Sequence, residues 1–205
     1  MIGLDDVERL VRERRSVRQF ADTPVAPELV TRLVAAATWA PSPSNRQGWN
    51  FTVIVSPALR QRMAAAARAR WQGLLEQAAE SAIGDELREY VRNFDWFGAA
   101  PVVIAVAARE PEAFLSHLFG PLAADVAGGR TAAAMAAQNL MLAAQAAGLG
   151  SCCLTGPLAA EEELKRLLGL GKRQNLVCLV ALGYPAGAPA ETTRKPVNDV
   201  IRFAE

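Results

Sequence analysis

The feature that most constrains this chain is a long apolar segment in its second half. Residues 131–149 are almost entirely apolar. They are interrupted by only three amide side chains, Gln138, Asn139 and Gln145. Glycines precede and follow the segment, which predicts a helix over residues 130–147 rather than a membrane span. Because such a helix offers no polar face to water, we expect it at the centre of the domain or in an interface between two copies.

Three shorter segments are apolar along their whole length and predict β-strands, at residues 49–55, 101–108 and 176–183. Helical patterns cover residues 5–14, 27–39, 57–80 and 158–168, with Asp5 or Asp6 as the expected N-cap of the first. Strands that are apolar on both faces need a helical layer on each side. The sequence therefore predicts a three-layer α+β or α/β fold. Because no linker or repeat divides the chain, we expect a single domain over residues 1–205.

Charge and composition exclude several classes of protein. The 22 basic and 21 acidic residues nearly balance, which argues against a nucleic-acid partner. Acidic residues at positions 5, 6 and 8 argue against a signal peptide. We therefore expect a cytoplasmic protein with neither a membrane nor a nucleic acid as its partner.

The cysteines and the histidine limit the chemistry further. Cys152, Cys153 and Cys178 form neither a disulfide framework nor a metal-ligand spacing, so no metal site is expected. The single histidine, His117, leaves only one possible Ser-His or Cys-His pair, which weakens a hydrolase interpretation. Cys152 and Cys153 are expected to be small buried fillers.

The first candidate site is the segment Arg-Arg-Ser-Val-Arg-Gln-Phe at residues 14–20. Three guanidinium groups and a hydroxyl within five residues can surround a phosphate with charged hydrogen bonds. In an extended segment, Arg14, Ser16 and Arg18 point to the same side, because side chains alternate with a period of two. The alternative is an ordinary basic helix end. No glycine-rich dinucleotide fingerprint or P-loop is present.

Two further segments are candidates for binding a cofactor. Residues 41–49 form a loop rich in Pro, Ser and Asn that could hold a planar heterocycle. Residues 148–157 combine glycines with N–H groups that precede a helix, and such groups can donate to ring heteroatoms. Taken alone, the first is better explained as a plain helix-to-strand loop, and the second as a glycine-closed helix followed by a turn.

The order of these motifs is more specific than any one of them. The segment RRSVRQF, a helix, a PSxSNxQxW loop before a strand, an AxQNLxLAA helix, then GLGSC and a basic C-terminal tail resembles the nitroreductase family of FMN enzymes. The resemblance spans about residues 8–203. It implies an α+β fold with a mainly antiparallel central sheet flanked by helices, in place of the parallel sheet that the apolar strands alone suggest. It also implies an intertwined homodimer with FMN sites built from both subunits.

The resemblance assigns roles to particular residues. Arg14, Arg15, Ser16 and Arg18 match the first flavin segment, in which Arg14 and Ser16 hold the phosphate and Arg18 lies beside the flavin N1–C2=O edge. The loop expected from the other subunit comprises Pro41, Ser42, Pro43 and Asn45. Backbone N–H groups facing flavin N5 and O4 come from Leu154, Thr155 and Gly156. The basic residues that close on the phosphate are Arg194 and Lys195. This sequence departs from the family pattern at Gly48, where proline is usual, and at Pro43, where a small polar residue or glycine is common.

The implied activity is that of an oxidoreductase in which the flavin carries the chemistry and no side chain is catalytic. NADH or NADPH would reduce FMN, and a small organic acceptor (a nitroaromatic, a quinone or a flavin) would then be reduced in a ping-pong hydride scheme. Trp96, Phe97, Phe114 and Phe119 could line the acceptor pocket or serve as core or lid packing. The alternatives are a flavin destructase, a reductive dehalogenase, a dehydrogenase of peptide heterocycles, a non-catalytic FMN-binding protein and an all-helical ligand-binding regulator.

Overall fold

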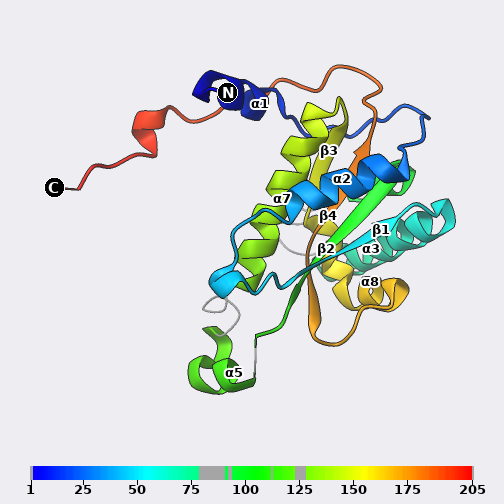
Figure 1. Ribbon diagram of the computed structural model, residues 1–205. Helices are drawn as coiled ribbons and strands as arrows, with labels where there is room; N and C mark the ends of the chain where they lie inside the picture. The colour runs from blue at the N-terminus through cyan, green and yellow to red at the C-terminus, as the bar shows by residue number, and fades with distance from the viewer. Residues whose placement is uncertain (1, 79–90, 92–93, 112, 123–127, 205) are drawn as a thin grey trace.

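The computed structural model describes residues 2–78, 91, 94–111, 113–122 and 128–204. Its strands form one four-stranded sheet in the order β1-β2-β4-β3, in which every neighbouring pair is antiparallel (Figure 1). The strands are β1 (Trp49–Ile54), β2 (Val102–Arg109), β3 (Gly150–Leu154) and β4 (Gln174–Gly183). The antiparallel sheet implied by the resemblance is therefore confirmed, and the parallel sheet suggested by the apolar strands is wrong.

Helices cover both faces of the sheet. They are α1 (Leu4–Glu13), α2 (Pro27–Ala37), α3 (Pro57–Ala78), α5 (Ala113–Phe119), α7 (Gly129–Ala146) and α8 (Glu161–Leu168). Short 3-10 helices are η1 (Pro43–Asn45), η2 (Trp96–Ala99), η3 (Gly120–Leu122), η4 (Gly156–Ala160) and η5 (Val197–Asp199). One apolar core joins α2 and α7 to the sheet, and a second joins α3, η4 and α8 to its other face. The predicted three-layer arrangement is confirmed.

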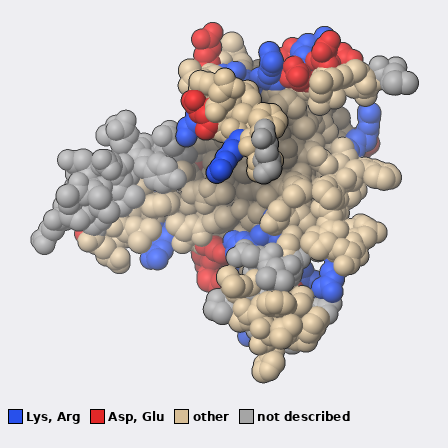
Figure 2. All heavy atoms as spheres, turned by 90° about the vertical axis from the view of Figure 1, so that its left-hand side faces the viewer, with Lys and Arg blue, Asp and Glu red and all other residues tan. Residues whose placement is uncertain are grey.

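Helix α7 packs one face against the sheet and leaves the other open. Its buried stripe consists of Ala132, Ala133, Ala136, Ala137, Leu140, Met141 and Ala144. The alanines let the helix backbone approach the sheet closely. On the opposite face Met135 is 43% exposed. Figure 2 views the molecule from the left-hand side of Figure 1, where α7 lies, and the middle of this surface is largely uncharged.

Several local predictions need correction. Residues 150–154 form a fourth strand that the sequence patterns missed. The N-cap of α1 is Gly3, and Asp6 instead accepts a hydrogen bond from the Gly3 N–H group at 3.1 Å. Phe97 is fully buried in the core beneath α3, so it does not line a substrate pocket. Within the ranges described above, no helix combines the length and apolar character that a membrane crossing needs.

Candidate functional site

The first candidate segment lies along β3 in an extended conformation. Ser16 forms a parallel bridge with Ser151, and the Val17 N–H group donates to the Ser151 carbonyl at 3.0 Å. Gly150 permits this close approach, because a Cβ atom there would lie 2.7 Å from the Val17 side chain. The segment also bonds to the chain beyond β4, through Ala21 to Tyr184 at 2.8 Å. Residues 16–21 are therefore held between the ends of β3 and β4.

Arg14, Ser16 and Arg18 differ from Arg15 in their surroundings, as the predicted alternation requires. Arg14, Ser16 and Arg18 all act on Cys152 of β3. Arg15 faces another way and donates to the Ala190 carbonyl at 2.9 Å, which anchors the C-terminal segment. The guanidiniums of Arg14 and Arg18 thus share one side of the chain with the Ser16 hydroxyl.

The positive charges of Arg14 and Arg18 favour an anion near the Ser16 hydroxyl. Burial raises the pKa of the Cys152 thiol, while Arg18, a hydrogen bond with Ser16, and Arg14 act in the opposite direction. The Nε atom of Arg14 is buried and has no hydrogen-bond partner among the residues that the structure describes. A buried unpaired donor is costly, so a ligand that accepts from it would gain affinity.

A cavity of about 450 Å³ adjoins Arg18 at the junction of β3 and η4. Its other lining residues are Phe94, Trp96, Cys152, Cys153, Leu154, Thr155 and Gly156. Arg18 also lines a second cavity, of about 260 Å³, with Ser16 and residues 187–190. The structure thus brings the first and third candidate segments together. Cys153 is exposed here, so its assignment as a buried filler is wrong, whereas that of Cys152 is confirmed.

The second candidate segment is a strained loop. Ser44, Asn45 and Gln47 have φ values of 51°, 51° and 48°, a conformation that residues other than glycine rarely adopt. The Ser42 hydroxyl holds the turn by accepting from the Gln47 N–H group at 3.0 Å. Pro43 packs on Gly128, where a Cβ atom would lie 2.6 Å from the proline ring. Such strain persists only where the surroundings enforce it, and it is frequent at ligand sites.

The two halves of the predicted cofactor site lie at opposite ends of α7. Ser42 and Pro43 share a cavity with Gly129 at the beginning of the helix. Arg15 and Val17 share one with Gln145 and Gly148 at its end. Eighteen residues of α-helix measure about 27 Å. A single copy of the chain therefore does not bring the loop of residues 41–45 to Arg14 and Arg18.

Other predicted site residues lie elsewhere. Arg194 and Lys195 are on an extended C-terminal segment that leaves the body past α1 (Figure 1), where Arg194 donates to Thr192 Oγ1 and to the Thr193 carbonyl, both at 2.9 Å. Trp96 lines the β3–η4 cavity, whereas Phe114 is 59% and Phe119 is 39% exposed on α5. Among the residues that the structure describes, no group of three His, Cys, Asp or Glu side chains could hold a metal ion.

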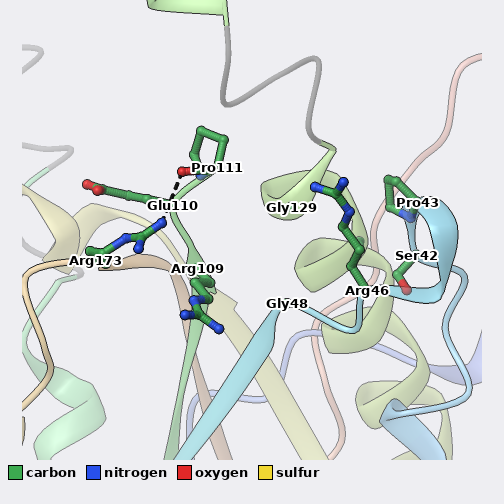
Figure 3. A pocket seen from close by; sticks show the side chains of 10 residues that line it. Ser42, Pro43, Arg46, Gly48, Arg109, Glu110, Pro111, Gly129 and Arg173 are labelled. Atoms are coloured by element: carbon green, nitrogen blue, oxygen red, sulfur yellow. Dashed lines mark hydrogen bonds between the residues drawn. The ribbon is translucent and has the colours of Figure 1, made fainter. Parts of the chain in front are cut away.

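The sequence patterns did not predict one further cluster. Arg46, Arg109 and Arg173 meet around a cavity at the beginning of α7 (Figure 3). They come from the loop before β1, the end of β2 and the turn before β4. No local motif marks them, because only the strand pairing brings these positions together.

Comparison with known proteins agrees with this fold. A BluB-like flavoprotein from Clostridium difficile 630 superposes with a TM-score of 0.84, at 27% identity, over 97% of this chain and 99% of that one. An NADH dehydrogenase from Thermus thermophilus is 28% identical, over 96% of this chain and 95% of the relative. A 4-nitrobenzoate reductase from a Nocardioides species is 27% identical, over 98% and 91%. The model of the nitroreductase family matches residues 11–184, and the chain therefore belongs to that family.

Proposed function

We propose that this chain is an FMN-dependent oxidoreductase that takes electrons from NADH or NADPH and passes them to a small organic acceptor. The observation that carries the proposal is the unpaired, buried Nε atom of Arg14, on the same side of its segment as Ser16 and Arg18. The similarity to an NADH dehydrogenase, to a nitrobenzoate reductase and to a flavoprotein supports it.

The residues present fit a flavin mononucleotide. Arg14 and the Ser16 hydroxyl would bind the phosphate and the nearby ribityl oxygens. Arg18, between the two cavities, would place its positive charge at the edge of the ring where negative charge gathers on reduction. The backbone at Thr155 and Gly156 lines the larger cavity and would donate N–H groups to the ring. When bound, the flavin supplies the electron-transfer chemistry, and the protein binds, orients and shields it.

The proposal includes a homodimer. Two copies with their α7 helices antiparallel would bring the loop of residues 41–45 of one chain to the Arg14 segment of the other, and would form two equivalent sites. The open face of α7 supports this pairing, because Met135 lies exposed there. The C-terminal segment also carries exposed apolar side chains that lack an intrachain core, namely Val197, Val200, Ile201 and Phe203. On a partner subunit they would be covered, and Arg194 and Lys195 would accompany them toward a flavin site.

The decisive experiment is an anaerobic titration of the purified, FMN-loaded protein. We expect an oxidised-flavin spectrum that NADH or NADPH bleaches, and that a nitroaromatic or a quinone restores with stoichiometric reduction of the acceptor. Bleaching without restoration by any acceptor would instead favour a non-catalytic FMN protein. If neither nicotinamide bleaches the flavin, the proposed electron donor is wrong. Accumulation of dimethylbenzimidazole in air, when chemically reduced FMN is supplied, would then indicate a flavin destructase.

A further inference from the structure

The arginine cluster at the beginning of α7 surrounds a cavity of about 290 Å³ that the proposed flavin site does not use. Its lining includes Ser42, Gly48, Gly129 and three arginines, Arg46, Arg109 and Arg173. This volume suits one small group, such as a carboxylate on an aromatic ring, rather than a whole cofactor.

The fold fixes all three arginines at the backbone. The Arg109 N–H group donates to the Gly48 carbonyl at 2.8 Å, which ties the end of β2 to the loop before β1. The Arg173 carbonyl accepts from the Glu110 N–H group, also at 2.8 Å. Arg46 follows the strained turn η1. Figure 3 shows its guanidinium directed toward Gly129, with Arg173 on the other side of the opening and Arg109 between them.

Two of the three arginines have donor groups that no described residue uses. Arg109 makes no hydrogen bond or ion pair through its guanidinium with any described residue, and Arg173 donates only to the Pro111 carbonyl, at 3.3 Å. Glu110 is the one acidic residue among the described residues of the lining, and its carboxylate accepts from Asn175 at 3.4 Å. In Figure 3 that carboxylate points away from Arg46. The guanidiniums of Arg109 and Arg173 thus keep donor groups that no described residue uses.

The N-terminal end of α7 adds to the positive electrostatic potential of this cavity. Helix α7 has 18 residues, its N-cap is Gly128, and no side chain caps it from that position. Its first turn carries Arg130 and no acidic residue. The positive end of the helix dipole ordinarily attracts an anion, and a basic residue there is unfavourable unless an anion compensates it. The arginine cluster and the uncapped helix end therefore point independently to the same kind of ligand.

We propose that this cavity is a subsite for the oxyanion of an anionic substrate, held by Arg109 and Arg173. The inference rests on the proposed function, because Ser42 and Pro43 line the cavity and belong to the loop that would reach the partner's flavin. In the proposed dimer the subsite opens beside that flavin. An acceptor whose carboxylate binds here would then be held close to the reacting centre. A phosphate of the nicotinamide donor has the same chemistry and is the alternative source of the oxyanion.

The test uses the FMN-loaded protein and the variants Arg109→Gln and Arg173→Gln, with Arg70→Gln on α3 as the matched control. Benzoate and benzamide, which have the same ring and differ in charge, are titrated calorimetrically. KM is measured for a nitrobenzoate, the corresponding nitrobenzamide, NADH and NADPH. We expect each cavity variant to weaken benzoate binding, and to raise the KM for nitrobenzoate, at least about tenfold, as for a lost charged hydrogen bond. The neutral amides and the control variant should show no change.

The outcomes distinguish a substrate carboxylate from a nicotinamide phosphate as the source of the oxyanion. They also distinguish failure of the subsite from failure of the proposed function. A raised KM for NADH or NADPH with unchanged benzoate binding would assign the oxyanion to a nicotinamide phosphate. Unchanged benzoate binding together with unchanged KM values for every charged substrate would overturn the subsite. Benzoate binding that depends on Arg109, in a protein whose flavin no nicotinamide bleaches, would leave the subsite standing and reject the proposed electron donor. Because the Arg109 guanidinium makes no described contact, Arg109→Gln is expected to fold normally.

Discussion

The substitution Met135→Glu is expected to separate the two subunits and release the flavin. Met135 lies on the open face of α7, 43% exposed in the single chain, and would be covered by the partner helix. Burying an unpaired carboxylate there costs on the order of 3 kcal/mol or more, which corresponds to at least about a hundredfold rise in the Kd of the dimer. Sedimentation velocity at micromolar concentration should then show monomers.

The loss of flavin follows from the position of the site. If each FMN is held by Arg14 of one chain and by the loop of residues 41–45 of the other, a monomer keeps only half of the contacts. The control is Val55→Glu, which places the same charge on an apolar residue that is 62% exposed between β1 and α3. That variant should stay dimeric and yellow. A Met135→Glu protein that remains a flavin-loaded dimer would show that α7 does not form the interface.

Replacing Arg14 by alanine is expected to lower FMN affinity by about 1.5–3 kcal/mol, or roughly tenfold to a hundredfold. The lost group is a guanidinium whose Nε atom is buried and unpaired, so its removal takes away a ready donor and breaks no described hydrogen bond. The Kd for FMN is measured by the quenching of flavin fluorescence on titration of the apoprotein. The free energy of unfolding of the apoprotein should change little.

Two companion variants sharpen this measurement. Arg14→Lys keeps the charge without the planar fork and should restore part of the affinity. Arg12→Ala removes an exposed arginine that pairs with Glu8 on α1, and it should bind FMN like the parent protein. An Arg14→Ala protein with unaltered FMN affinity would contradict the phosphate role of this residue.

Much of the fold was predictable because its signals are local. The apolar period of the helices and the continuous apolar strands place α2, α3, α7, β1, β2 and β4 close to their observed bounds. Strand β3 was missed because Gly150 to Leu154 is short and begins with glycine and serine, which do not favour strands. It forms because β4 pairs with it on one side and Val17 with Ser151 on the other. Strand direction was likewise not readable from the apolar pattern and came from the family resemblance.

The candidate site, like the fold, was predictable from the sequence only where its signals are local. Alternation along an extended chain predicts that Arg14, Ser16 and Arg18 lie on one side, and all three act on the Cys152 thiol. The same rule separated Arg15, which anchors the C-terminal segment at Ala190. The cofactor roles of these residues stay predictions. That the loop of residues 41–45 lies at the far end of α7 depends on tertiary packing, for which the sequence carries no local signal.

The most direct test of the shared flavin site is complementation between two chains, each with one half of the site weakened. One chain carries Arg14→Ala, and the other has residues 41–45 replaced by glycines, which can adopt the positive φ values found at Ser44 and Asn45. The two are coexpressed with different tags and purified as the mixed dimer. One of its two sites then combines both unaltered halves, so the mixed dimer should bind about half the parent's FMN with the parent's affinity. A mixed dimer that binds FMN no better than either altered homodimer would contradict the account.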